Sequence, residues 1–371
     1  MSNIAKRLDP IDALRGLMIV IMALDHTSYF VAQNHPPGEQ WGGEFPVYDD
    51  AFAFLTRLVT HPAASGFAFL MGVGMYLFAH SRRAQGWREW GIIRHFMIRG
   101  GFLIALQLVI INRVWQMGLD RFTELYIGVL IALGGCMILG SFLLRLKPTY
   151  LLVLTCILFI GTELSHPDPS QWGLNYNQQL GLLLIYSGGD SSLWSNYPIL
   201  SWLELVTFGI FFGHWLVEDS GRAFKRALWL GVAFLVAFVV IRYLDGFGNV
   251  RSRMGNTWID FFNVVKYPPS MSFTLLTMGV NLTILSLFGR VSEKLQIILQ
   301  PLIVFGRAPL FFYVFHLFLY LGMGRWLAPN GTTIPVMYIY WLLGLLILFP
   351  FTLWYGVFKQ GQPAHSALRF L

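Results

Sequence analysis

The 371 residues are 56% hydrophobic and only 12% charged, whereas soluble domains are about 25% charged, so the composition excludes an ordinary soluble protein and indicates a polytopic membrane protein. The net charge of +7 comes from segments that flank apolar runs and not from one solvated basic face, which argues against a nucleic-acid-binding protein. The two cysteines, Cys136 and Cys156, fall in apolar runs, so we expect them to be packing residues and not a disulfide or a metal site.

Apolar runs long enough to cross about 30 Å of hydrocarbon recur along the whole chain. No soluble domain, low-complexity tract or fixed-period repeat interrupts them. We therefore predict an all-α integral membrane protein in which a single domain, residues 1–371, packs about ten transmembrane helices into one bundle. The expected helix cores, in chain order, are 13–31, 63–80, 98–112, 125–144, 149–163, 198–217, 227–244, 271–288, 302–322 and 335–358.

The distribution of Lys and Arg predicts the orientation of the bundle, because cytoplasmic loops near helix ends are enriched in both residues. With the N-terminus inside, sixteen of the 26 basic residues fall at cytoplasmic helix ends and eight fall on the opposite side. We therefore expect both termini in the cytoplasm. Arg15 and Asp25 interrupt the first apolar run, and no small-residue cleavage pattern follows it, so we expect a retained first span and not a signal peptide.

The longest predicted outer loops are 32–61 and 164–197. The second contains no Lys or Arg and is rich in Trp, Tyr, Asn and Gln, and its stretch NQQLGLLLIY is expected to form a short interfacial helix. Aromatic and amide side chains suit a lid at the membrane surface and also suit contact with a sugar. The sequence leaves both roles open.

The first span, DALRGLMIVIMALDH, carries four ionisable side chains in or beside a membrane helix, where each is costly. Arg15 and His26 are eleven residues apart, which at about 100° per residue is about 20° past three turns, so they should share one helix face about 16.5 Å apart in depth. Asp12 is placed to pair with Arg15. Asp25 points about 100° away from His26 and should act through another residue. The alternatives are an interfacial anchor for Arg15 and an interhelical hydrogen bond for His26.

A second polar group is expected near the outer end of the first span. The stretch TRLVTHPAASGF brings Arg57 and His61 into the membrane from the outer side, at the depth of that end. At the inner side, Arg99 and Arg307 begin predicted helices near the depth of Arg15, and several arginines at one level suit phosphate binding. The alternative for each arginine is positive-inside anchoring.

An ordered set of motifs resembles a known family. The spacing of Arg15 and His26, an Arg followed after ten residues by a His, resembles the signature of the integral-membrane acyltransferase superfamily. More narrowly, the chain resembles the bacterial branch related to heparan-α-glucosaminide N-acetyltransferase over about residues 9–325. The segments that carry this resemblance are, in order, DALRGLMIVIMALDH, FLTRLVTHPAASGFAFLMGVGM, IRGGFLI, YPILSWLELVTFGIFFGHWL and KYPPSMSFTLLTMG.

The resemblance implies an acetyl-CoA or other acyl-CoA donor bound from the cytoplasmic side, with transfer to an acceptor at the outer side of a cell membrane, here a bacterial inner membrane. It also implies that Arg15 and His26 are the essential pair of the superfamily. The chain reads THPAASGF where the bacterial branch usually has a Cys and a Pro after the histidine. His35 is the nearest counterpart of a later histidine in the human-type enzyme, so the resemblance leaves open which histidine does the chemistry.

These observations favour a membrane-bound acyltransferase that moves an acetyl or other short acyl group from acyl-CoA to a hydroxyl or amine of a sugar or lipid-linked acceptor, with a histidine as general base. We expect no metal, because no cluster of residues has metal-ligand spacing. The residue assignments are His26, Asp25 and His61 as catalytic, Arg15, Arg99 and Arg307 as donor-binding, and Arg57, His35, Lys266, Tyr267 and His316 as acceptor-binding. For His316, which lies alone on an apolar helix, the alternative is an interhelical hydrogen bond.

Two other function classes stay open from the sequence. Intramembrane Asp, His and Arg residues also mark the ion and proton paths of transporters and proton-coupled carriers, although such proteins usually show inverted repeats, and none is recognisable in this sequence. A scaffold protein without chemistry would leave the shared face of Arg15 and His26 unexplained. The expected partners are the lipid bilayer, acyl-CoA and the acceptor, with no nucleic acid, and the sequence allows a homodimer.

Overall fold

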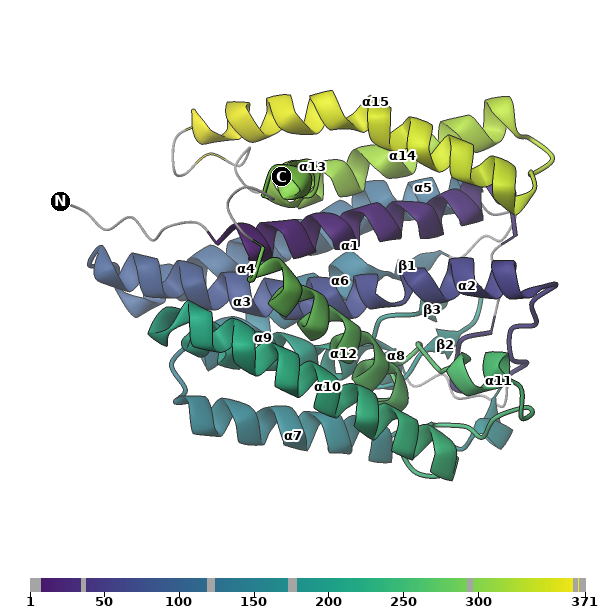
Figure 1. Cartoon of the computed structure of the whole chain (residues 1–371), viewed down its shortest axis with the longest axis horizontal. Coiled ribbons are helices and arrows are strands. Elements are labelled where there is room, and N and C mark those ends of the chain that lie inside the picture. The colour runs from purple at the N-terminus through teal and green to yellow at the C-terminus, as the bar shows by residue number, and fades with distance from the viewer. Residues whose placement is uncertain are drawn as a thin grey trace.

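The computed structural model describes residues 8–34, 38–118, 124–172, 179–291, 296–362 and 366. Within these ranges the chain is almost entirely helical, with three short strands (Figure 1). His35, one of the predicted acceptor-binding residues, lies outside the described residues.

The elements follow one another as α1 (Asp9–Thr27), η1 (Ser28–Ala32), α2 (Ala51–Thr60), α3 (Pro62–Ala84), α4 (Glu89–Leu106), η2 (Gln107–Ile111), α5 (Asn112–Gly118), β1 (Leu125–Ile127), α6 (Val129–Leu143), α7 (Pro148–Leu164), η3 (Pro169–Gln171), α8 (Gln179–Leu184), β2 (Gly188–Gly189), β3 (Leu193–Ser195), α9 (Ile199–Glu218), α10 (Ser220–Leu244), α11 (Trp258–Phe262), α12 (Met271–Phe288), α13 (Gln296–Arg307), α14 (Pro309–Leu327) and α15 (Ile334–Gln360).

Eight helical segments of the described chain are long and apolar enough to span a membrane, namely Asp9–Ala32, Ala51–Ala84, Glu89–Gly118, Ile199–Glu218, Ser220–Leu244, Met271–Phe288, Pro309–Leu327 and Ile334–Gln360. Shorter apolar helices, among them α6 and α7, accompany them. Most long helices run along the long axis of the molecule, whereas α13 is seen nearly end-on and therefore lies across the bundle (Figure 1). The prediction of an all-α membrane protein is thus confirmed, and each predicted core overlaps a helix.

Two predicted helix cores are wrong in their boundaries. Residues 125–127 of the predicted core 125–144 form strand β1, and α6 begins only at Val129. The apolar run 302–322 is expected to form a single helix, but the structure divides it at Ala308 between α13 and α14. A residue before proline is disfavoured in the helical conformation, and Ala308, which precedes Pro309, has φ −133° and ψ 57°. Hydropathy alone does not register this change of backbone direction, so the prediction from apolar runs missed α13 as a separate element.

The predicted outer loop 32–61 also contains unexpected order. Its second part forms α2, which begins where the Asp50 side chain accepts a hydrogen bond from the backbone N–H of Ala53 at 2.7 Å. The helical segment continues through His61 into α3. Arg57 therefore lies in α2 and not in a loop, and His61 joins α2 to α3.

Two glycines allow α1 and α13 to cross in close contact. A Cβ atom added at Gly16 of α1 would overlap the backbone carbonyl of Leu302 in α13. A Cβ atom added at Gly306 of α13 would overlap the carbonyl of Asp12 in α1. Small residues at such crossings let helix backbones approach each other inside a membrane. This contact fixes the position of α13 beside the first turns of α1, which carry Asp12 and Arg15.

One end of the bundle is covered by a cap, which consists of residues 38–50, 124–127, 179–198 and 245–270. In the cap β1 pairs in parallel with β3, and β2 pairs with β3 in the antiparallel sense. A separate apolar cluster joins the other three segments of the cap to one another and is formed by Trp41, Phe45, Leu182, Tyr186 and Val265, whereas 124–127 is attached through the pairing of β1 with β3. The opposite, uncapped end is the one where α3 ends and α4 begins (Figure 1), and the basic residues predict that it is cytoplasmic.

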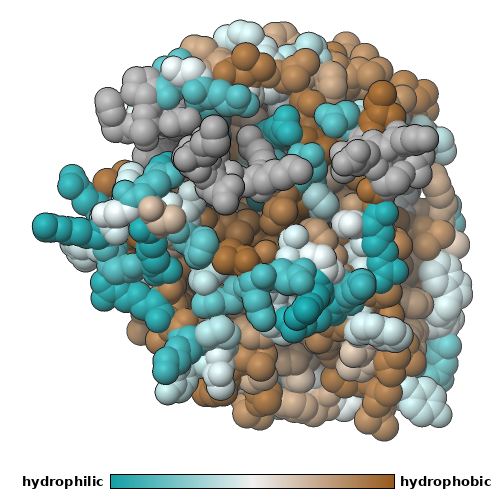
Figure 2. All heavy atoms as spheres, turned by 60° about the vertical axis from the view of Figure 1, so that its left-hand side comes forward, coloured by the Kyte–Doolittle hydropathy of each residue, from teal (hydrophilic) through white to brown (hydrophobic). Residues whose placement is uncertain are grey.

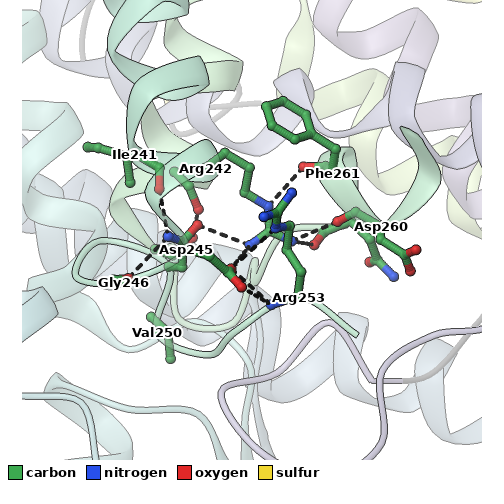
Figure 3. A network of polar contacts seen from close by, with 12 residues as sticks. Ile241, Arg242, Asp245, Gly246, Val250, Arg253, Asp260 and Phe261 are labelled. Carbon is green, nitrogen blue, oxygen red and sulfur yellow. Dashed lines mark hydrogen bonds and ion pairs between the residues drawn. The ribbon is translucent and has the colours of Figure 1, made fainter. Parts of the chain in front are cut away.

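A buried arginine orders the part of the cap that follows α10 (Figure 3). Arg242, which is 1% exposed, donates to the backbone carbonyl oxygens of Asp260, Phe261 and Asn263 at 2.6–2.8 Å. The five donors of a guanidinium group can satisfy several carbonyl groups of an irregular segment at once. The loop that leads to Lys266 and Tyr267 is therefore held in one conformation.

Candidate functional site

The two ends of α1 face the C-terminal helices α13 and α14. Near the uncapped end, Arg15 donates to the Asp12 carboxylate at 2.7 Å and to the carbonyl oxygen of Gly306 in α13 at 3.1 Å. Near the capped end, His26 contacts His316 of α14. The shared direction of Arg15 and His26 agrees with their helical spacing, and the predicted pairing of Asp12 with Arg15 is confirmed.

Aromatic and imidazole rings surround His26. Its Nδ1 atom lies 2.7 Å from Nε2 of His316. The rings of Trp115 in α5 and Tyr313 in α14 stand edge-on to the His26 ring, with centroid distances of 5.2 and 6.4 Å. His26 is half-buried, whereas His316 is fully buried. The His26 imidazole is therefore held by ring contacts on several sides, with one of its nitrogens occupied by a second imidazole.

Asp25 belongs to a different polar network, which is centred on Arg57. Asp25 accepts hydrogen bonds from Arg57 Nη1 and, at 3.2 Å, from Thr60 Oγ1. The same guanidinium group bonds both carboxylate oxygens of Glu39, with Arg57 Nε 2.6 Å from Oε1. His61 Nε2 lies 2.8 Å from Glu39 Oε1, and because an ionised carboxylate only accepts, this nitrogen carries the hydrogen. Arg57 thus joins a carboxylate of α1 to a carboxylate of the cap.

Glu39 is the residue of this network that sequence reasoning missed. It is 3% exposed, yet it lies in the predicted outer loop 32–61 beside other acids, and no periodic pattern distinguishes it from them. Burial alone raises the pKa of Glu39, but the Arg57 guanidinium and the His61 ring beside it hold that pKa well below its usual value. Glu39 is therefore a buried carboxylate whose charge is compensated.

The cap brings Lys266 and Tyr267 to the same network. Their backbone N–H groups both donate to the carbonyl oxygen of Glu39 at 2.9 Å. Lys266 is 3% exposed and its ammonium group lies 5.1 Å from the centre of the Tyr267 ring; no hydrogen-bond acceptor of the described residues contacts it. The Tyr267 hydroxyl is 3.3 Å from that of Tyr197, and burial raises the pKa of both, so both stay protonated.

A small pocket of about 50 Å³ opens beside the pair of Asp25 and Arg57. Its lining is formed by Leu24, Asp25, Ser28, Asn34, Val47, Tyr48, Asp49, Ala53, Thr56, Arg57, Thr60 and Ile334. A volume of this size holds a few water molecules. Because Asp25 and Arg57 line it and His26 does not, the pocket adjoins the carboxylate network and not the imidazole pair.

At the uncapped end, Arg99 and Arg307 join Arg15. Arg307 lies 3.4 Å from Asp9 and 3.8 Å from Asp12. Arg99 interacts electrostatically with Arg15, and its Nε atom is buried without a hydrogen-bond partner among the described residues. Arg15 and Arg307 therefore share two carboxylates, and Arg99 adds a third guanidinium group without one, which leaves a net positive charge. Figure 2, which brings this end forward, shows hydrophilic side chains gathered beside an area of apolar ones.

The expected place of two arginines within their helices needs correction. Arg99 is expected at the start of its helix, but α4 begins at Glu89 and carries Arg99 in its second half. The helix extends through a polar stretch that hydropathy excludes from the predicted core. Arg307 is likewise expected at the start of a helix, but it is the last residue of α13. The partial negative charge at a helix C-terminus stabilises a cation such as Arg307 at this position.

No group of three or more His, Cys, Asp and Glu side chains in the described ranges is arranged as metal ligands. The two cysteines are free, with Cys136 buried and Cys156 exposed.

Comparison with known families supports the resemblance drawn from the motifs. A direct search of curated proteins gives no match. The family model described as heparan-alpha-glucosaminide N-acetyltransferase, catalytic, matches residues 7–245. The matched range contains Arg15, His26, Arg57 and Arg99 and ends before Lys266. Because it covers more than half of the 371 residues, the chain belongs to the heparan-α-glucosaminide N-acetyltransferase catalytic family.

Proposed function

We propose that this membrane acetyltransferase moves an acetyl or other short acyl group from acyl-CoA to a hydroxyl or amine of a sugar or lipid-linked acceptor, in a bacterial inner membrane. The observation that carries the proposal is the arrangement along α1. Arg15 near the uncapped end and His26 near the capped end both face the C-terminal helices, about 16.5 Å apart in depth. This separation suits a donor whose phosphates and thioester lie at opposite ends of an extended pantetheine arm.

The donor phosphates are proposed to bind Arg15, Arg99 and Arg307. Arg99 supports this role most directly, because its half-buried guanidinium lies near a second cation and contacts no carboxylate of the described residues. A phosphate oxygen would supply the missing acceptor, and charge-assisted hydrogen bonds of this kind are strong. The hydrophilic side chains of Figure 2 lie at the end where this donor would enter.

His26 is proposed as the general base. Its ring takes the proton of the acceptor hydroxyl or amine while the oxygen or nitrogen of that group attacks the thioester carbonyl carbon. The carbon–sulfur bond then breaks, and the thiolate of CoA leaves and receives the proton from the His26 imidazolium. The products are the acylated acceptor and CoA, and His26 returns to its neutral form.

Residues of the cap and of α2 are proposed to assist. The Lys266 ammonium group, buried without an acceptor in the described chain, and the Tyr267 hydroxyl are suited to an oxyanion or a polar group of the acceptor. Asp25, Arg57 and His61 would act indirectly, because they bond one another and Glu39. His61 is the second candidate for the base, but at 1% exposure it is less accessible than His26.

A purified-protein assay tests the proposal. Detergent-solubilised protein is supplied with acetyl-CoA and amino-sugar or hydroxyl acceptors, and release of free CoA and acylated product are measured together. His26→Ala should lower the rate by on the order of 100-fold or more, whereas His80→Ala, a change of an exposed histidine in α3, should leave it unchanged. Normal activity of folded His26→Ala would refute the assignment of the base. Solute transport without consumption of acetyl-CoA would instead favour the carrier alternative, which the family match does not support.

A further inference from the structure

His316 uses both of its ring nitrogens within the protein. Its Nδ1 atom lies 3.0 Å from the carbonyl oxygen of Phe312, one turn earlier in α14, and its Nε2 atom lies 2.7 Å from Nδ1 of His26. The side chain is completely buried. The ring of Phe312 stacks on it at a centroid distance of 5.3 Å, and the ring of Tyr320 stands edge-on at 6.2 Å. Neither nitrogen is left to contact an acceptor, which argues against the predicted acceptor-binding role.

The chemistry of these contacts decides where the hydrogens are. A carbonyl oxygen only accepts hydrogen bonds, so His316 Nδ1 carries a hydrogen and donates it to Phe312. In a neutral ring, Nε2 of His316 then has the lone pair and must accept from His26. A doubly protonated His316 would place a cation among aromatic rings, and no carboxylate of the described residues contacts it. The bond between the two rings therefore runs from His26 Nδ1–H to His316 Nε2.

We propose that His316 is a positioning residue that fixes the tautomer of His26. With its hydrogen held on Nδ1, His26 has its lone pair on Nε2, which is the form that a general base requires. The backbone of α14 determines this choice, because the Phe312 carbonyl sets the tautomer of His316 and His316 sets that of His26. The inference rests on the proposed function only for its catalytic consequence, since the tautomer itself can be measured without activity.

The orienting group is unusual in being neutral. Many catalytic histidines are oriented by a carboxylate, and Asp25 is adjacent to His26 in the sequence, yet Arg57 binds it from α2. Among the described residues, the titratable side chains around His26 include His316 and Tyr313 of α14, and Tyr126 of β1 lies against Trp115. A neutral His316 orients the His26 ring among aromatic side chains without adding a buried charge.

Two substitutions separate the hydrogen bond from mere packing. In His316→Gln the amide oxygen can still accept from His26, whereas His316→Leu fills the site without an acceptor. We expect kcat of His316→Gln to stay within about threefold of wild type and kcat of His316→Leu to fall on the order of 100-fold. The KM for acetyl-CoA should be unchanged in both. The acid limb of the pH–rate profile should move to lower pH only in His316→Leu, because the imidazolium of His26 then loses its hydrogen-bond acceptor.

Nitrogen-15 NMR of histidine-labelled protein in detergent reads the tautomer directly, with the His26 signals assigned by their loss in His26→Ala. The wild type should show His26 protonated on Nδ1 alone near neutral pH, and His316→Leu should show mixed tautomers. A wild-type His26 protonated on Nε2 would overturn the inference whether or not the His316 variants fold. So would a wild-type kcat and pH profile in folded His316→Leu. Failure of the proposed function is distinct, because it appears as absence of acyl transfer in the wild type while the NMR still reports the tautomer.

Discussion

Replacing Arg57 with methionine tests whether the buried charge network fastens the cap to the helix bundle. Arg57 is 4% exposed and its guanidinium bonds Asp25 of α1 and both carboxylate oxygens of Glu39 in the cap. Methionine has a similar length but provides no donor. The substitution therefore leaves two carboxylates without their cation, with the Thr60 hydroxyl and the His61 N–H among the donors that remain.

Removing one partner of a buried ion pair costs much more stability than replacing both partners together. Removing one partner of such a pair typically costs about 3–5 kcal/mol, because the other charge stays buried without compensation. Arg57→Met affects two carboxylates, so we expect the free energy of unfolding to fall by at least the lower value. Arg57→Lys should lose less, since the charge remains, but its single ammonium group cannot reproduce the forked contact with Glu39.

Unfolding in detergent, followed by the fluorescence of the 13 tryptophans, measures the change. The double variant Arg57→Met with Glu39→Gln provides the matched control, because it removes a carboxylate together with its cation. It should be less destabilised than the sum of the two single variants. A free energy of unfolding of Arg57→Met within about 1 kcal/mol of wild type would refute this reasoning. It would show that removing Arg57 does not leave costly buried charge on Asp25 and Glu39.

Three further predictions follow from other contacts. The folded-state pKa of Glu39 is depressed, so its stabilising contribution is present above the unfolded-state pKa of about 4.3 and is lost as the pH falls toward the folded-state value. In Glu39→Gln the free energy of unfolding should therefore fall less steeply as the pH is lowered. Gly306→Ala should lower the free energy of unfolding by about 1–3 kcal/mol, because the added Cβ atom overlaps the backbone of α1. Gly74→Ala places its Cβ atom in open space, so this variant should unfold at the wild-type temperature or above it. Arg99→Gln should weaken CoA binding on the order of 10- to 100-fold, as measured by the CoA concentration that raises the unfolding temperature. Arg145→Gln, which changes a 57% exposed arginine, should leave CoA binding unchanged. Equal effects of the two substitutions would show that nonspecific charge explains the binding.

The apolar runs alone were enough to predict an all-α membrane bundle, because the hydrocarbon thickness sets the length of each span. Helical periodicity also predicted that Arg15 and His26 face one way and that Asp25 points elsewhere, since this geometry is local to α1. The expectation that Arg57 and His61 lie near the outer end of α1 agrees with their contacts to Asp25 and Glu39. The division of α13 from α14 was missed, although Pro309 marks it in the sequence.

Only the tertiary structure decided which polar groups meet. Glu39 and Arg57 are eighteen residues apart, and His26 and His316 are 290 apart, so no helical spacing relates the members of either pair. A hydrogen bond depends on a few tenths of an ångström and on donor direction, which are set by how whole helices pack. A single sequence specifies the faces of each helix, because side-chain direction repeats with the helical turn. The choice of partner across helices is a property of the packed bundle as a whole.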